Sequence, residues 1–155
     1  MTSRFKYSSG AYSAMDGLEK YLAHCSLEPG LVHLMKLRAS QLNGCAYCID
    51  MHWKDLREIE ETEQRLYSLD AWRECPYYTD RERAALAWTE AVTFVASGHV
   101  PDAVHDEVRR HFTDQEIADL TVAVSVINSW NRLAIASRTE PGTYQPVRKS
   151  TAVTA

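Results

Sequence analysis

The sequence predicts a single all-α domain, and three observations support this prediction. Apolar residues recur mostly three and four positions apart, which is the spacing of amphipathic helices. Residues 79–82 and 113–116 both match the capping box that begins a helix. The chain has 155 residues, of which 45% are hydrophobic, and no linker rich in Gly or Ser divides it. This length is enough to bury one ordinary core.

Residues that typically begin or end helices give the expected elements in order. Pro29 suits the first turn of a helix, and Asn43-Gly44 tolerates the left-handed conformation that ends one. Residues 120–128 are rich in β-branched side chains, but their length and the upstream capping box favour a buried helix over a strand. We expect helices over residues 13–27, 29–43, 45–61, 79–96, 101–112 and 113–137, with a short piece over 65–72.

The remaining parts of the single domain, residues 1–155, are expected to be less regular. After Arg138 the chain has the prolines and glycine of an extended arm, and we expect residues 1–12 and 147–155 to be flexible ends.

Composition narrows the class of protein. The net charge of -4 and the scattering of basic residues among acids argue against a nucleic-acid partner. No apolar run reaches the roughly 20 residues of a membrane span, and the N-terminus has no signal-peptide core. We therefore expect a cytoplasmic protein without a membrane partner. Two of its four cysteines have C-x-x-C spacing, which in the cytosol indicates redox chemistry or metal binding.

The chemistry is expected at Cys45, Cys48 and His52, in the segment CAYCIDMH. Offsets of three, four and seven place the three side chains on one face of a helix. A cysteine at the N-terminal end of a helix is favoured as a thiolate, and His52 is one turn from Cys48 and can take its proton. These are the parts of a two-electron cycle between a dithiol and a disulfide.

Other interpretations of these residues stay open. With His33 from the preceding helix, the two cysteines and His52 would make a structural zinc site of two Cys and two His. The pair could also be two buried, inert cysteines beside a chance histidine. Arg38 could place a positive charge near the thiols, although a solvated arginine on a helix is the simpler expectation. Cys25 and Cys75 stand alone and are expected to be packing residues.

The segment LVHLMKLRASQLNGCAYCIDMHWKDLRE resembles the core of the alkylhydroperoxidase D (AhpD)-like family, within the carboxymuconolactone decarboxylase superfamily. The resemblance extends over about residues 15–146. It implies an AhpD-like helical bundle in which a helical hairpin carries the C-x-x-C motif, and a homo-oligomer, commonly a trimer or hexamer. It implies an antioxidant enzyme, a peroxidase or disulfide reductase, that acts on a hydroperoxide without a cofactor. Its electrons would come from a dithiol reductant, such as a lipoylated or thioredoxin-like protein.

The resemblance also implies a role for each residue of the motif. Cys48 would be the sulfur that is oxidised, Cys45 would resolve it, and His52 would belong to the proton relay. The family often has a glutamate twelve residues before the first cysteine, where this chain has His33, and a histidine where it has Tyr47. His33 can shuttle protons but cannot supply a permanent negative charge to orient His52.

Two alternatives to a hydroperoxide-reducing enzyme are therefore considered. One is a metal-binding or redox-sensing module that uses Cys45, Cys48, His52 and His33. The other, a lactone decarboxylase, is suggested by the superfamily name alone and would leave the thiol pair unused.

Overall fold

The computed structural model describes residues 3–146, which contain eight α-helices, one short 3-10 helix and no β-strand. The predicted all-α class is confirmed. The elements are α1 (Ser9–Leu22), α2 (Pro29–Asn43), α3 (Ala46–Glu58), α4 (Glu63–Tyr67), η1 (Leu69–Ala71), α5 (Asp80–Thr93), α6 (Val95–Gly98), α7 (Asp102–Arg109) and α8 (Asp114–Ser137). Within the described residues, no helix combines the length and the apolar character that crossing a bilayer requires.

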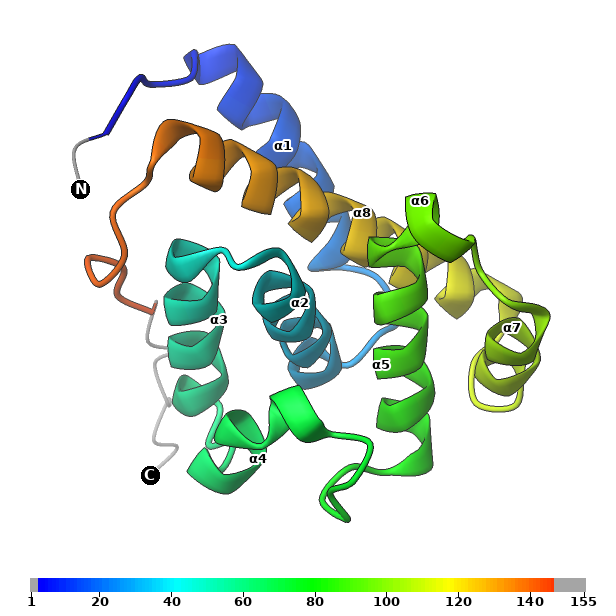
Figure 1. Cartoon of the computed structure of the whole chain (residues 1–155). Coiled ribbons are helices and arrows are strands. Elements are labelled where there is room, and N and C mark those ends of the chain that lie inside the picture. Colours follow the sequence, from blue (N-terminus) through cyan, green and yellow to red (C-terminus); the bar gives the residue numbers. More distant parts are fainter. Residues whose placement is uncertain (1–2, 147–155) are drawn as a thin grey trace, which may run out of the picture.

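Helix α2 lies at the centre of the molecule, with α3, α5 and α8 packed around it (Figure 1). A helix that contacts neighbours on several sides needs more than one apolar face, and α2 is buried over almost its whole length. Its buried side chains are Leu31, Val32, Leu34, Met35, Lys36, Leu37, Arg38, Ala39 and Ser40. The thiol motif follows directly on this central helix, so the site begins in the most constrained part of the fold.

Both predicted capping boxes are present. The hydroxyl of Thr79 accepts a hydrogen bond from the amide of Glu82, whose carboxylate accepts from the Thr79 amide, and Thr113 and Glu116 pair in the same way. These boxes begin α5 and α8. Residues 120–128 are helical, as the upstream cap predicted.

Several predicted helix ends were wrong. The first helix begins at Ser9 rather than residue 13, because the Ser8 hydroxyl caps it by accepting from the Ala11 amide. It ends at Leu22 rather than residue 27, and the next residues turn toward Pro29, whose ring disfavours helix in the residue before it. The helix expected over 79–96 is divided at Phe94 into α5 and α6.

The expectation that Arg38 is solvated was also wrong. Its side chain is 7% exposed. Its Nε donates to Glu90 Oε1 at 2.8 Å and its Nη1 to Asp70 Oδ1 at 2.5 Å. Arg38 therefore connects α2 to α5 and η1 and is paired away from the thiols.

The N-terminal end of the described chain packs against the last turns of α8. The amide of Arg4 donates to the carbonyl of Ser137 at 2.9 Å, and the Tyr7 hydroxyl donates to the carbonyl of Leu133 at 3.2 Å. Residues 9–12, expected in a flexible end, belong to α1. The other expected flexible end, 147–155, lies outside the described residues.

Candidate active site

A tight turn between α2 and α3 positions the thiol motif. Gly44 adopts a left-handed conformation (φ 67°), which ends α2 and favours glycine. The amide of Cys45 then donates to the carbonyl of Ser40 at 3.0 Å. Cys45 is thereby fixed as the N-cap of α3, and the predicted helical hairpin carrying the C-x-x-C motif is present.

Cys45 and Cys48 are paired as a disulfide, with their Cα atoms 5.4 Å apart. The Cys45 sulfur also accepts a hydrogen bond from the Cys48 amide at 3.4 Å. The two residues are only 1% and 2% exposed. The positive end of the α3 dipole lies at these sulfurs, so a thiolate formed on reduction would be stabilised there.

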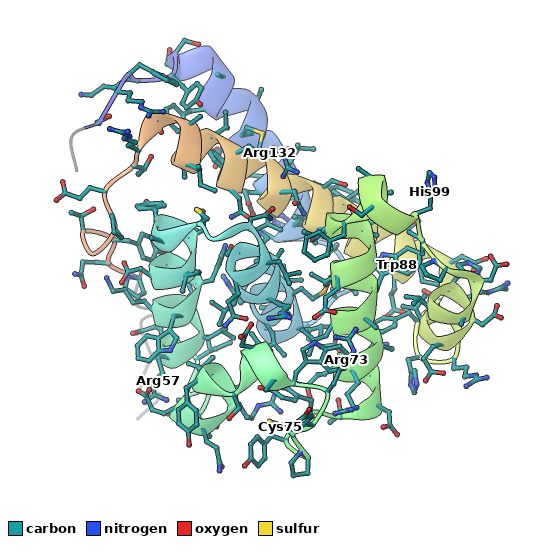
Figure 2. All side chains as sticks on the ribbon, in the orientation of Figure 1. Arg57, Arg73, Cys75, Trp88, His99 and Arg132 are labelled. Atoms are coloured by element: carbon teal, nitrogen blue, oxygen red, sulfur yellow. A yellow bond between two sulfur atoms is a disulfide. The ribbon has the colours of Figure 1, made fainter. Side chains whose placement is uncertain are left out.

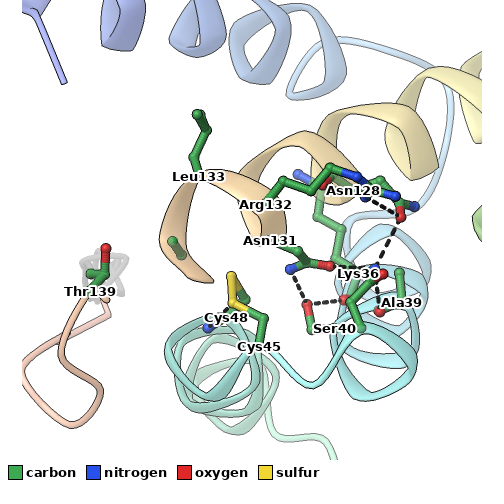
Figure 3. Close-up of a disulfide and its surroundings, with 12 residues drawn as sticks. Lys36, Ala39, Ser40, Cys45, Cys48, Asn128, Asn131, Arg132, Leu133 and Thr139 are labelled. Atoms are coloured by element: carbon green, nitrogen blue, oxygen red, sulfur yellow. Dashed lines mark hydrogen bonds between the residues drawn. A yellow bond between two sulfur atoms is a disulfide. The ribbon is translucent and has the colours of Figure 1, made fainter. Parts of the chain in front are cut away.

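Polar side chains of α2 and α8 hold the turn in place (Figure 3). Asn131 is fully buried, and its Nδ2 donates to the Ser40 hydroxyl at 3.0 Å. Its Oδ1 accepts from Asn43 Nδ2 at 2.9 Å, and Asn43 also donates to Asn128 Oδ1. This network fixes the last turn of α2 against α8 beside the disulfide.

The disulfide lies between two hollows. Cys48 lines a cavity of about 390 Å³ together with His52, His33 and Asp55. Cys45 instead borders a second hollow of about 530 Å³ beneath the segment that follows α8. Five of the residues that line the first cavity are tyrosine or tryptophan, and its lining is completed by Tyr7, Tyr12, Glu19, Lys36, Tyr47, Met51, Trp130, Leu133, Ala134, Ser137, Thr139 and Tyr144.

His52 is buried one turn after Cys48, on the same face of α3. Its Nδ1 lies 3.3 Å from Nδ1 of His33, which comes from α2. Burial lowers the pKa of His52 well below its ordinary value, and the charges of Lys36 and His33 lower it further. The imidazole is therefore neutral near pH 7. Its Nε2 is buried and has no hydrogen-bond partner among residues 3–146.

Asp55 is a member of the site that we did not identify in the sequence. Its Oδ2 lies 3.7 Å from His33 Nδ1 and 3.8 Å from His52 Nδ1, and its Oδ1 accepts from the Tyr144 hydroxyl at 2.7 Å. Burial and this carboxylate together raise the pKa of Tyr144, which stays a neutral donor. The negative charge that His33 cannot supply is thus supplied by Asp55. The offset of three residues from His52 to Asp55 was the available signal.

An ion pair with one buried member forms another part of the cavity wall that the sequence did not reveal. Lys36 is 4% exposed, and its Nζ donates to Glu19 Oε2 at 2.5 Å. Glu19 Oε1 accepts from Trp130 Nε1 at 3.0 Å. The pair brings α1, α2 and α8 together at the cavity, and the carboxylate of Glu19 offsets the buried charge of Lys36.

The structure brings together the four residues expected at the site, Cys45, Cys48, His52 and His33. With the sulfurs joined, the predicted set of two Cys and two His offers no thiolate for zinc in this state. Outside the site, Cys25 and Cys75 are free and half-buried against the core. His99 points outward from the end of α6 and Cys75 lies in the turn before α5 (Figure 2).

The chain is an all-α bundle with a C-x-x-C pair at the start of one helix and a histidine one turn later. These features place it in the class of helical proteins that carry a thiol pair. The family model for "Carboxymuconolactone decarboxylase family" matches residues 10–91. The chain belongs to this family, and it is AhpD-like within it.

Two relatives resemble the chain over almost its whole length. The uncharacterized protein YdfG of Bacillus subtilis is 42% identical over 134 residues, which cover 86% of this chain and 91% of YdfG. A crystal structure from Agrobacterium tumefaciens, of a protein of unknown function described as a candidate antioxidant defence protein AhpD, is also 42% identical. It superimposes with a TM-score of 0.89 and covers 92% of this chain and 100% of its own.

The fold extends to a more distant structure. An uncharacterized peroxidase-related protein from Silicibacter sp. TM1040 superimposes with a TM-score of 0.78 at 22% identity. The match covers 88% of this chain and 72% of that protein. At this identity the likeness concerns the fold.

Proposed function

We propose that this protein is an antioxidant enzyme that reduces hydroperoxides through a redox disulfide between Cys45 and Cys48. The observation that carries the proposal is the disulfide between these two sulfurs, of which Cys48 lines a cavity that also contains the neutral imidazole of His52. A sulfur pair at this position has the three requirements of a peroxidase cycle: a site for substrate, a proton acceptor and a resolving thiol.

The reaction begins with the reduced protein. The Cys48 thiol gives its proton to His52, and the thiolate attacks the terminal oxygen of the hydroperoxide. The O–O bond breaks, the alkoxide takes the proton from His52 and leaves as an alcohol, and Cys48 becomes a sulfenic acid. The Cys45 thiol then attacks the Cys48 sulfur, which releases water and forms the disulfide.

The surroundings of the two sulfurs support their unequal roles. Cys48 faces the aromatic cavity and shares a helix face with His52, which suits the sulfur that meets the substrate. The buried Nε2 of His52 has no partner within residues 3–146 in the oxidised state, so the thiol of reduced Cys48, one turn away, would supply one. Cys45 faces the other hollow, which suits a sulfur that is attacked by an incoming reductant.

His33 and Asp55 complete the proposed proton relay. Only one of the two facing Nδ1 atoms can carry a proton, so His33 and His52 share it. Asp55 stabilises the imidazolium that forms when His52 accepts the thiol proton. Its carboxylate takes the electrostatic part that the family's glutamate would have at position 33.

The proposed partners follow from the disulfide. Two electrons and two protons must come from a dithiol, such as a lipoylated or thioredoxin-like protein, which becomes a disulfide in turn. We further propose a homo-oligomer, a trimer or hexamer, since large apolar side chains such as Phe94 and Val95 are exposed in the single chain. Light scattering on the eluting protein measures its mass and checks this state.

Peroxide consumption by thiol variants tests the proposed function. With dihydrolipoamide as reductant, Cys48→Ser should lose turnover altogether. Cys45→Ser should be oxidised once per protomer and then stall, as a sulfenic acid that dimedone traps. Cys75→Ser, which removes a free cysteine outside the site, is the matched control and should keep the parent rate. Steady-state turnover at the parent rate in both motif variants would contradict the proposal.

A further inference from the structure

Three side chains beside the disulfide each place one atom within 4 Å of the other two. Nδ1 of His33 and Nδ1 of His52 lie 3.3 Å apart. Asp55 Oδ2 lies 3.7 Å from the first and 3.8 Å from the second. We propose that these three atoms bind a divalent transition-metal ion such as Zn²⁺, at a site that goes beyond the proposed peroxidase and contains no sulfur.

The three distances fit a single ion. The point equidistant from the corners of this triangle lies about 2.1 Å from each atom, which equals the usual Zn–N and Zn–O bond length. Raising the ion about 0.6 Å out of the plane lengthens each bond only to about 2.2 Å and leaves room for a fourth ligand. Binding would therefore need no rearrangement of α2 against α3.

Hydrogen bonds among His33, His52 and Asp55 explain the positions of these three side chains less well than a shared metal ion does. Separations of 3.7 and 3.8 Å are too long for N–H···O bonds from either imidazole to Asp55. The contact between His33 and His52 sets two nitrogens of the same kind face to face, and only one of them can donate. Atoms that share a cation have this spacing and need no proton between them.

The outer contacts of the group also suit a metal site. The Tyr144 hydroxyl donates to Asp55 Oδ1, which leaves Oδ2 directed at the imidazoles. Hydrogen bonds of this kind orient the ligands of a metal and are a regular part of such sites. The three ligands line the cavity of about 390 Å³, so a fourth position is open to water or a small ligand.

The chemistry of the donors selects the kind of ion. Two imidazole nitrogens and one carboxylate oxygen suit Zn²⁺, Co²⁺, Fe²⁺ or Ni²⁺. Ca²⁺ and Mg²⁺ prefer sites made of oxygen ligands. The sulfurs are absent from this set, in contrast to the zinc site considered from the sequence, so the disulfide need not be reduced for the metal to bind.

Metal binding would change the part that His52 plays. An ion on Nδ1 leaves the proton of the neutral imidazole on Nε2, so His52 could no longer accept the proton of Cys48. The metal-loaded and peroxide-reducing states would then exclude each other, which makes the ion an inhibitor of the proposed reaction.

Calorimetric titration of the oxidised protein with ZnCl₂, after removal of metals by EDTA, tests the site. One equivalent per protomer should bind, and Co²⁺ in place of Zn²⁺ should show ligand-field bands without a thiolate charge-transfer band. Asp55→Asn and His33→Gln should each weaken Zn²⁺ binding at least about tenfold. Asp50→Asn is the matched control, because Asp50 lies on the same helix as Asp55 but pairs with Lys54. The affinity of this variant for Zn²⁺ should stay within about twofold of that of the parent protein.

The titration separates this proposal from the peroxidase. The Cys45→Ser, Cys48→Ser double variant lacks both reactive thiols, so it cannot reduce peroxide, yet it should bind Zn²⁺ like the oxidised parent. Circular dichroism of each variant checks that it is folded. Failure of both the oxidised parent and the double variant to bind one equivalent would overturn the proposal, and so would parent affinity in a folded Asp55→Asn protein.

Discussion

The carboxylate of Asp55 has different partners on its two oxygens. Oδ1 accepts from the Tyr144 hydroxyl, whereas Oδ2 faces the two imidazoles at distances too long for hydrogen bonds. A carboxylate rotates easily when nothing holds it, so the hydroxyl of Tyr144 decides which way the negative charge points. The residue that holds Asp55 for the proposed relay therefore lies after α8, about 90 positions from Asp55 itself.

Tyr144→Phe should slow the oxidation of Cys48 without removing any reacting group. Loss of the hydrogen bond to Asp55 is worth about 1 kcal/mol, which corresponds to a decrease of about three- to tenfold in rate. Stopped-flow mixing of the reduced protein with peroxide measures this rate. Tyr77→Phe removes the hydroxyl of an exposed tyrosine that contacts Gln64, and it should leave the rate unchanged. Equal rates in both variants would show that Tyr144 does not orient the relay.

At the scale of elements, the last turn of α2 is attached to α8 by amide side chains. Asn131 has no exposed surface, and its amide uses both its oxygen and its nitrogen, toward Asn43 and Ser40. Each of these partners lies within five residues of Cys45. The network therefore contributes to stability and also fixes the turn that places the sulfurs.

Asn131→Leu should destabilise the protein by about 2 to 3 kcal/mol, because it removes two hydrogen bonds, one donated to the buried Ser40 hydroxyl and one accepted from Asn43. Urea denaturation followed by circular dichroism measures the change in the free energy of unfolding. Ser129→Ala, at an exposed position of the same helix, should change it by less than about 0.5 kcal/mol. A loss no larger than that of the control would argue against the network.

The carboxylate of Glu90, on α5, is held by side chains from α2 and from the turn after η1. Burial alone would raise the pKa of Glu90, but hydrogen bonds from Trp72, Arg73 and Arg38 outweigh it and lower that pKa below its ordinary value. An acid whose pKa is lowered by folding stabilises the protein above its unfolded pKa. That contribution is lost as the pH falls from the unfolded pKa through the folded one.

Glu90→Gln should therefore lower the free energy of unfolding at pH 7 by about 1 to 3 kcal/mol, and less as the pH decreases below about 4. Denaturation curves at pH 7, 5 and 3.5 give the comparison. Glu74→Gln, an exposed position, should follow the parent at every pH. Parallel pH profiles for the parent and Glu90→Gln would contradict the stabilising role of the charged carboxylate.

The sequence predicted interactions between residues that are close along the chain, and it missed interactions between residues that are far apart along it. The caps at Thr79 and Thr113 depend on residues three positions away, and the disulfide hairpin depends on a turn beside it, so both were visible. Arg38 instead meets partners 32 and 52 positions away, at Asp70 and Glu90. No local pattern distinguishes such an arginine from a solvated one.

The site follows the same rule. The spacing of Cys45, Cys48 and His52 predicted that they share one face of a helix. His33 was predicted to join them because it lies on the helix that precedes the motif. The contacts of Asp55 with His33 and of Tyr144 with Asp55 depend on how α3 packs against α2 and how the segment after α8 packs against α3.

At the scale of the whole molecule, both ends of the described chain close the cavity. Tyr7 precedes α1 and Thr139 follows α8, yet both line it together with Cys48 from the middle of the sequence. The Tyr7 ring packs edge-on against Tyr12, with 6.1 Å between centroids, and Tyr12 stacks on Trp130 at 6.0 Å. The first residues thus form an aromatic part of the wall of the cavity that Cys48 lines.

This wall predicts a preference among substrates. Tyr7→Ala removes an aromatic contact worth about 1 kcal/mol, so the KM for a bulky aromatic substrate such as cumene hydroperoxide should increase about fivefold. The KM for hydrogen peroxide should not change, because this molecule has no apolar group that would pack against the Tyr7 ring. The kcat for both should stay at the parent value, since Tyr7 lies outside the proposed relay.

Steady-state kinetics with both peroxides, measured with the same dithiol reductant, checks the preference. Tyr67→Ala removes an exposed aromatic ring from α4, which does not line the cavity, and serves as the control. An equal rise in KM for the two peroxides would mean that Tyr7 supports the fold of the cavity and does not contact the substrate. A selective rise would assign the N-terminal segment, which supplies Tyr7 to the cavity wall, to substrate binding.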